Sequence, residues 1–319
     1  MHSRTKRRLT PEQLDALARR ALGAGVNLSE ELTDGFANAV WRLSLHDGRR
    51  VVLKLSPSPD LDQLTYERGL LRMEAHAYEL AAAAGVPLAG LLAAGFDDPV
   101  LGGDYLLLRE LDGVPWNHAR LDPDRQLALR RELGGHLARL NSVRGDSFGY
   151  PWIAAPSWRA GYLAMVEALL KDTERYPTPL PAPVEEIRAL VHRAAPALDA
   201  VREPRLVHFD LWPGNVFLDL TGEPRIQAVI DLERAFWGDP LADLVTPTLF
   251  GELAEDDPVL AGYREVAPLE VDQTRLALYR VYLYLIMLVE NGPRQYPEED
   301  YAPLRALTTE SLVRALARL

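Results

Sequence analysis

The residues best suited to chemistry lie in the segment 206–218, LVHFDLWPGNVFL, and in the segment 228–231, AVID. The first contains the pattern His-x-Asp-x-x-x-x-Asn, with Asp210 as its acid and Asn215 as its amide, and the second ends in Asp231. One aspartate of such a set can orient a hydroxyl group and accept its proton. An asparagine and a second aspartate can hold Mg²⁺ on a nucleotide. The pattern therefore predicts phosphoryl transfer, with Asp210 as the base and Asn215 and Asp231 as metal ligands.

The neighbouring residues predict how these side chains are brought together. A strand over 216–219 can pair as a hairpin with a strand over 226–230, across the turn Leu-Thr-Gly-Glu. Such a hairpin places Asn215 and Asp231 together at its open end, which suits two oxygen ligands on one magnesium ion. We expect His208 to brace the loop through hydrogen bonds. The alternative is that the acids only cap a turn and end a strand, with no metal.

A second candidate group lies upstream. The residues around Gly35 and Asn38 are typical of a turn, and two strands are expected to follow, over 39–45 and 50–55. Lys54 is an isolated cation in the apolar second strand, and lysine is rarely buried without a partner. It could balance the charge of a nucleotide phosphate, for which the turn would supply backbone donors. The alternative is a solubility lysine on an edge strand.

These motifs resemble those of the aminoglycoside phosphotransferase and choline kinase superfamily. The stretch HFDLWPGN resembles the family's HGDLHPGN, and IDLE followed by GDPLAD resembles its IDWE and GDP-x-x-D. Phe209 and Trp212 depart from the family pattern, but the acid, the asparagine and the turn are kept. The resemblance extends from about residue 28 to the C-terminus. It implies a protein-kinase-like bilobal fold and phosphorylation of a small molecule.

The resemblance also implies a nucleotide site in the upstream half. Glu74 matches the position of the family's paired glutamate, so an ion pair with Lys54 is expected; the alternative is a solvated helix face. By analogy, the Arg109 carbonyl and the Leu111 amide would bind adenine. The phosphate loop has a single glycine and lacks G-x-G-x-x-G, which leaves ATP and GTP both open as donors. The nucleotide-binding residues expected on this basis are Gly35, Asn38, Lys54, Glu74, Arg109 and Leu111.

The expected fold class is α+β, with a small N-terminal lobe that contains an antiparallel sheet and a larger, mainly helical C-terminal lobe. The N-terminal nucleotide-binding lobe would cover residues 1–111, including a helix over 10–22, and the catalytic and acceptor-binding lobe residues 112–319. The further helices predicted from periodicity and capping residues cover 64–84, 122–141, 157–171, 184–200, 240–250, 271–291 and 303–319.

Composition restricts the partners. The chain has 319 residues, no cysteine and a net charge of −11, which argues against a nucleic-acid partner. Its most apolar run, 281–289, is far shorter than the ~20 residues needed to cross a membrane. We expect a cytoplasmic monomer or weak dimer. The acidity would attract a cationic acceptor, with candidate carboxylates at 252–257 and 298–300; a solvated acidic surface is the alternative.

The function predicted from the sequence is a magnesium-dependent small-molecule kinase that phosphorylates a hydroxyl group. The acceptor could be an aminoglycoside or another antibiotic. A metabolic sugar, ketoamine, amino alcohol or homoserine is the alternative, and the stretch Phe-Gly-Tyr at 148–150 is loosely similar to ketoamine-phosphorylating relatives. A hypothesis of another class is a regulatory protein that binds a nucleotide without catalysis.

Overall fold

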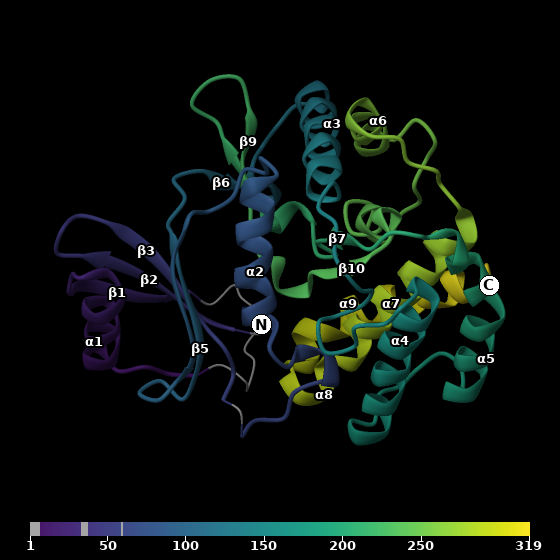
Figure 1. Ribbon diagram of the computed structural model, residues 1–319, viewed down its shortest axis with the longest axis horizontal. Helices are drawn as coiled ribbons and strands as arrows, with labels where there is room; N and C mark the ends of the chain where they lie inside the picture. Colours follow the sequence, from purple (N-terminus) through teal and green to yellow (C-terminus); the bar gives the residue numbers. More distant parts are fainter. Residues whose placement is uncertain (1–6, 33–37, 59) are drawn as a thin grey trace.

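A five-stranded antiparallel sheet forms the N-terminal lobe, with strand order β1-β2-β3-β5-β4. The computed structural model describes residues 7–32, 38–58 and 60–319. Helix α1 lies on one side of the sheet, and α2 lies between the sheet and the C-terminal helices (Figure 1). The elements are α1 (Pro11–Leu22), β1 (Val26–Leu32), β2 (Ala39–Leu45), β3 (Arg50–Leu55), α2 (Leu70–Ala83), β4 (Leu91–Asp98) and β5 (Gly103–Arg109).

The two faces of the sheet bury different side chains, because successive residues of a strand point to opposite faces. Leu53 of β3 and Leu107 of β5 pack in the cluster that includes Leu14 and Leu17 of α1. Leu106 instead packs against Leu71 and Ala75 of α2. Lys54 is the cross-strand partner of Leu106, so its side chain belongs to the α2 face.

The C-terminal lobe is mainly helical and contains the largest apolar core. It also contains two small antiparallel sheets: β6 pairs with the β8–β9 hairpin, and β7 pairs with β10. The predicted α+β bilobal fold is therefore confirmed, whereas the lobe boundary after residue 111 stays a prediction. The elements are β6 (Val114–Pro115), α3 (Pro123–Leu140), α4 (Trp158–Arg175), α5 (Val184–Ala194), β7 (Arg205–Val207), β8 (Val216–Asp219), β9 (Arg225–Val229), β10 (Phe236–Gly238), α6 (Pro258–Val266), α7 (Gln273–Val289), α8 (Asn291–Arg294) and α9 (Glu298–Leu316).

The helix predicted over 64–84 is shorter than expected. Residues Thr65–Glu67 form a 3-10 helix instead, and Gly69 adopts a left-handed conformation with φ 75° before α2 begins at Leu70. Glycine takes this conformation without a steric penalty, so the chain turns sharply at this point. The turn separates α2 from a short segment that contacts the C-terminal lobe.

Proline explains two further differences from the predicted helices. The helix predicted over 240–250 is wrong: a 3-10 helix covers Pro240–Leu244 and the chain then turns, because Pro247 lacks an amide hydrogen and cannot continue a helix. The helix predicted over 184–200 ends as an α-helix at Ala194, just before Pro196, and continues in the 3-10 form. The final helix starts at Glu298, earlier than predicted, and accommodates Pro303 in its second turn.

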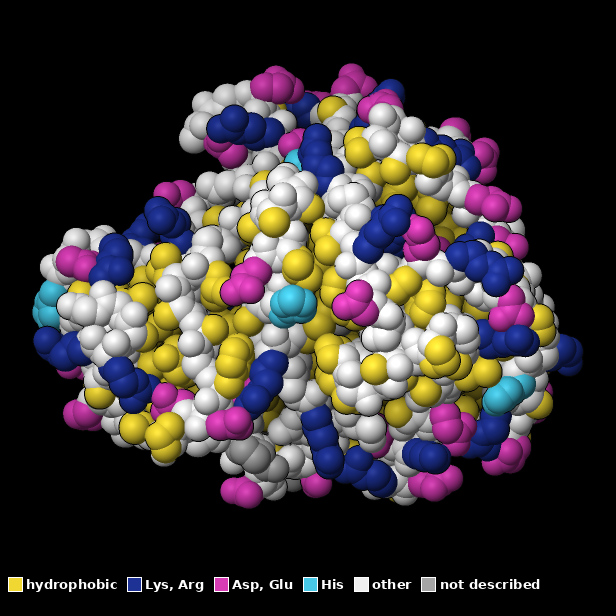
Figure 2. Space-filling view, viewed as in Figure 1, with side chains coloured by type: hydrophobic (Ala, Val, Ile, Leu, Met, Phe, Trp, Pro, Cys, Tyr) yellow, Lys and Arg dark blue, Asp and Glu magenta, His cyan; other side chains and the backbone are white. Residues whose placement is uncertain are grey.

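The surface carries charges of both signs. Figure 2 shows acidic and basic side chains interspersed over the visible face, with apolar side chains between them. No helix among the described residues is both long enough and apolar enough to span a bilayer.

Helices α3 and α6 cross in close contact because glycines line the crossing. A Cβ atom added at Gly134 would lie 2.0 Å from the Val259 carbonyl oxygen, and one added at Gly262 would lie 1.8 Å from the Arg131 carbonyl oxygen. Real Cβ atoms do not approach backbone this closely, so the helices can only meet here without side chains.

We predict that Gly262→Ala lowers the free energy of unfolding by about 1–3 kcal/mol, because the added methyl group forces α3 and α6 apart. Gly222→Ala is the matched control: it lies in the exposed turn between β8 and β9, where an added Cβ meets nothing within 4 Å. Urea unfolding of both variants measures the effect. Equal stability of the two variants would contradict close packing at this crossing.

Candidate active site

The predicted hairpin is present and brings two of the candidate metal ligands together. Strands β8 and β9 pair with Val216 opposite Val229, and the Ile230 amide donates a hydrogen bond to the Asn215 carbonyl at 3.0 Å. Asn215 therefore lies directly before the first strand, and Asp231 directly after the second. Sequence reasoning located this pair correctly because a hairpin fixes which residues meet at its open end.

The loop that carries Asp210 is held by the buried carboxylate of Asp243. Its Oδ1 atom accepts hydrogen bonds from the amides of His208 and Phe209, at 2.9 and 2.8 Å, and Oδ2 accepts one from Asn141 at 2.7 Å. Phe209 has φ 60°, a conformation that is uncommon without glycine. The two amide bonds at Asp243 hold the loop in this shape. The role of Asp243 was not predicted, although it ends the GDPLAD motif.

His208 braces the loop as expected. The Asp210 amide donates to its Nδ1 atom at 3.2 Å, so Nδ1 acts as an acceptor and the ring proton lies on Nε2. Nε2 is 3.1 Å from the Ile230 carbonyl, to which it donates. Burial lowers the pKa of His208 to about 4, so the ring is neutral at physiological pH. His208 thus ties the Asp210 loop to the strand that leads into Asp231.

The side chain of Asp210 is largely buried beside two potential donors. Asn215 Nδ2 donates to the Asp210 carbonyl at 2.8 Å and approaches Oδ2 at 3.3 Å, while Arg234 Nη1 is 3.6 Å from Oδ1. Burial raises the pKa of Asp210 to about 7, against the opposing effect of Arg234. A carboxylate with a pKa near neutrality is well suited to accept a proton at physiological pH.

Lys54 joins the two lobes through carboxylates. Its ammonium lies 2.7 and 2.8 Å from the two oxygens of Glu74 on α2, which confirms the predicted ion pair. It also lies 2.5 Å from Asp231 Oδ1 and 3.7 Å from Glu233 Oε2, both of which follow β9. Glu74 is fully buried and the Lys54 side chain is 10% exposed. The buried ammonium is thus shared among three carboxylates.

The same three carboxylates could hold a cation. Ligand oxygens of Glu74, Asp231 and Glu233 all lie within 4.8 Å of one another. Burial and the nearby Asp231 raise the pKa of Glu233 to about 7, because its ionised form is disfavoured next to another carboxylate. When all three acids are ionised, their charge exceeds that of Lys54, the one cation that they share. A divalent cation with oxygen ligands would relieve that excess, and the donor set therefore fits Mg²⁺. Glu233 lies in the IDLE stretch, but its participation was not predicted.

Two residues, Gly35 and Asn38, were expected at the phosphate turn. Gly35 lies outside the described residues. Asn38 is buried and donates a hydrogen bond to Glu233 Oε2 at 2.5 Å, which places the residue after the phosphate turn beside the carboxylate cluster. At the other end of the sheet, β5 ends at Arg109, and the Leu111 amide donates to no group among the described residues. The adenine contacts expected of these two residues stay a prediction.

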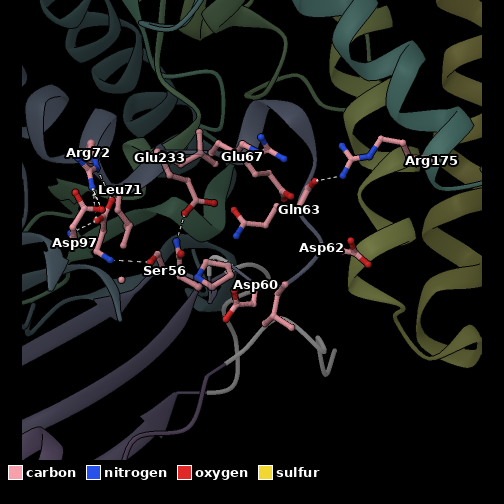
Figure 3. A pocket seen from close by; sticks show the side chains of 18 residues that line it. Ser56, Asp60, Asp62, Gln63, Glu67, Leu71, Arg72, Asp97, Arg175 and Glu233 are labelled. Carbon is pink, nitrogen blue, oxygen red and sulfur yellow. Dashed lines mark hydrogen bonds and ion pairs between the residues drawn. The ribbon is translucent and has the colours of Figure 1, made fainter. Parts of the chain in front are cut away.

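A pocket of about 600 Å³ opens beside the cluster. Asn38 and Glu233 line it together with Ser56, which follows β3, and with Gln63 and Glu67 from the segment before α2. Arg175 of α4 donates to the Gln63 carbonyl at one end of the pocket (Figure 3). The pocket therefore lies between the sheet, the segment before α2 and the helical lobe.

The two acidic segments proposed for a cationic acceptor do not line this pocket. Glu252 forms ion pairs with Arg280 and Arg318, Asp257 caps α6, and Glu298 pairs with Arg305. Carboxylates at the pocket come from other segments; they are Asp60, Asp62, Glu67, Asp97, Asp104 and Glu233.

Comparison with protein families identifies the family to which the chain belongs. The model described as "Phosphotransferase enzyme family" matches residues 29–279, most of the chain and all of the candidate site. The chain belongs to this family. The superfamily resemblance noted in the sequence is thereby confirmed.

Two curated proteins illustrate the range of its relatives. Acyl-CoA dehydrogenase family member 10 of Mus musculus is 27% identical over 276 residues, which are 81% of this chain and 23% of that protein. A protein named as a ketoamine kinase in Lactiplantibacillus plantarum is 35% identical over 99 residues, 31% of this chain and 33% of that protein. The chain spans between 23% and 60% of the length of the curated relatives that it matches.

Solved structures share the fold over nearly the whole chain. A protein named as a fructosamine-3-kinase from Thermobifida fusca has a TM-score of 0.65 at 24% identity, over 94% of this chain and 98% of its own. A variant of the aminoglycoside phosphotransferase APH(4)-Ia, in a ternary complex with AMP-PNP and hygromycin B, has a TM-score of 0.64 at 18% identity, over 96% and 98% of the two chains. At these identities the likeness establishes the fold alone.

The raised pKa of Asp210 makes the stability of the protein depend on pH. Between the ordinary pKa of an aspartate and about 7, the folded protein keeps a proton that the unfolded chain has lost, so the stability falls as the pH rises through this window. We predict that Asp210→Asn, which cannot ionise, is more stable than the wild type by about 1–4 kcal/mol above pH 7. The difference should shrink toward pH 4. Thermal unfolding at pH 4.5 and 8 measures it, and the same difference at both values would contradict the raised pKa.

Proposed function

We propose that this protein transfers the γ-phosphoryl group of ATP or GTP to a hydroxyl group of a small acceptor, with Mg²⁺ as the cofactor. The observation that carries the proposal is the meeting of Lys54 from the sheet, Glu74 from α2 and Asp231 from the hairpin within hydrogen-bond distance. A buried lysine shared among carboxylates of both lobes is an arrangement suited to a metal–phosphate group.

In this proposal the residues have separate roles. Asp210 orients the acceptor hydroxyl and accepts its proton at a carboxylate oxygen. Asn215 holds the Asp210 loop through its side-chain amide and offers its oxygen to the metal. Lys54 leaves Asp231 to contact phosphate oxygens and stays paired with Glu74, which fixes its direction. Positioning and electrostatics supply most of the catalysis in such a site.

Asp231 and Glu233 would hold the metal together with Asn215. Bound Mg²⁺ would neutralise the negative charge shared by the phosphates and these carboxylates. The support is chemical: the carboxylates are already clustered, and the pKa of Glu233 is raised by burial and by Asp231. Asn38, which is hydrogen-bonded to Glu233, would keep the start of β2 close to the metal.

The acceptor class has two candidates. An aminoglycoside is suggested by the family and by the fold shared with a protein solved with hygromycin B. A ketoamine is favoured by curated relatives named as ketoamine kinases and by the fold shared with a protein named as a fructosamine-3-kinase. Both are polyhydroxylated and carry nitrogen, and the mixed acids and arginines of the pocket could bind either.

We predict that Asp210→Ala lowers kcat for phosphoryl transfer by about 10²–10⁴, because the acceptor hydroxyl loses its proton acceptor. Nucleotide affinity should change little, since Asp210 contacts neither Lys54 nor Glu74 among the described hydrogen bonds. ADP release and calorimetric titration of the nucleotide measure the two effects. Turnover of Asp210→Ala at the wild-type rate would contradict the assignment of Asp210 as the base.

The acceptor is identified by screening ADP release across aminoglycosides, ketoamines, amino sugars and amino alcohols, with and without Mg²⁺. The proposal predicts magnesium-dependent release that rises with at least one acceptor and disappears in Asp210→Ala. Nucleotide binding with no release for any acceptor would instead support a regulatory protein without catalysis.

A further inference from the structure

A chain of buried ion pairs runs from Asp210 to the segment before α2. Arg234 lies between Asp210 and Glu290, with its Nη2 atom 2.9 Å from Glu290 Oε2. Arg294 lies between Glu290 and Glu67, at 2.8 and 2.6 Å. The charges alternate along this ladder of five residues.

The ladder is shielded from water. The Arg294 side chain is 2% exposed, and those of Arg234, Glu290 and Glu67 are 10–11% exposed. Buried charges lose hydration that only their partners can replace, so each arginine depends on both of its carboxylates. Glu290 Oε2 contacts both arginines, which makes it the shared acceptor at the centre. Loss of one member therefore disturbs its neighbours on both sides.

The far end of the ladder fixes the start of α2. Glu67 accepts a hydrogen bond from the Leu64 amide at 2.8 Å, so the Arg294 contact holds the whole Leu64–Glu67 turn. The same turn is bound to α4, since Asp172 accepts from the Thr65 amide at 2.7 Å and from its hydroxyl at 2.9 Å. Gly69, at the cap of α2, offers no side chain to the helix. Apolar packing holds the body of α2, and the contacts of the turn with the helical lobe hold its N-terminal end.

Helix α2 carries Glu74, seven residues after Glu67. Figure 3 shows Glu67 and Glu233 along the same pocket, so the turn and the carboxylate cluster face one space. Movement of the turn would shift α2 and with it the carboxylate that directs Lys54. Both ends of the ladder therefore involve the proposed active site: one end is Asp210 itself, and the other, Glu67, lies in the turn before the helix that carries Glu74.

We propose that Arg294 is a positioning residue for phosphoryl transfer, because it fastens α2 to the helical lobe and so keeps the Lys54–Glu74 pair in register with Asp210. The inference rests on the proposed function for its catalytic consequence, but the mechanical link is independent of it. Arg294 itself touches neither Lys54 nor Asp210 among the described contacts.

The test compares three variants of the full chain. Arg294→Met removes the link, Arg294→Lys keeps a charge that cannot bridge two carboxylates as a planar fork does, and Arg305→Met is the control. Arg305 pairs with Glu298 on the exposed side of α9, where both side chains are at least 36% exposed. Amide hydrogen exchange of residues 70–83 and calorimetric titration of ATP with Mg²⁺ are measured for each.

We expect Arg294→Met to speed exchange across α2 by about tenfold and to weaken MgATP binding by about tenfold, with α3 unchanged. Arg294→Lys should recover part of both effects, and Arg305→Met should match the wild type. Unchanged α2 exchange in a folded Arg294→Met protein would overturn the proposal, even if its melting temperature falls.

Glu67→Met keeps the proposal testable if Arg294→Met does not fold, because it removes the oxygen that Arg294 contacts and leaves Arg294 paired with Glu290. It should likewise speed α2 exchange, and wild-type exchange in this variant would contradict the link. If Arg294→Met folds, the amides of α2 should exchange no faster in the double variant at positions 67 and 294 than in Arg294→Met alone. If the wild type fails to bind MgATP, the proposed function fails, whereas the exchange results still decide whether the ladder positions α2.

Discussion

The burial of one ammonium group constrains how the two lobes of this protein meet. Lys54 is removed from water by the sheet and by α2, and a buried charge is tolerated only with compensating partners. Its partners come from two lobes: Glu74 from α2, and Asp231 with Glu233 from the segment after β9. The lobes must therefore be packed at a fixed distance for the charge to be satisfied.

The rest of the site is supported by buried carboxylates that bond to backbone and arginine groups. Asp243 holds two amides of the Asp210 loop, and burial raises its pKa to about 6. Asp239 binds Arg275 and the Tyr279 hydroxyl at 2.7 and 2.6 Å, which joins the segment after β10 to α7. These contacts explain why the loops of the site keep their shape. Each loop is tied to a helix that lies deep in the core.

The sequence predicted the parts of the site that local rules determine. The hairpin fixed the meeting of Asn215 and Asp231, and the isolated Lys54 in an apolar strand indicated a buried partner. The left-handed turn at Gly69 and the break near Pro247 were missed, although glycine and proline mark both positions. Periodicity alone extended these helices too far, because it does not account for backbone conformation.

Long-range ion pairs could not be predicted in the same way. Arg234, Glu290 and Arg294 are charged residues in helical or turn segments, and nothing in their spacing distinguishes them from residues on a solvated surface. Their burial depends on how α7 and α8 pack beneath the segment before α2, which is a property of the tertiary structure. Glu233 was visible in a motif, but its role depends on the distance to Lys54.

The most direct test of the shared carboxylate site is calorimetric titration of ATP into the wild type and Asp231→Asn, each with Mg²⁺ and with a chelator. If Asp231 holds the metal on the nucleotide, the wild type should bind ATP about tenfold more tightly with Mg²⁺ than without it. Asp231→Asn should lose most of this difference while it keeps the fold. Equal affinity of the wild type under both conditions, or an unchanged magnesium effect in Asp231→Asn, would contradict the account.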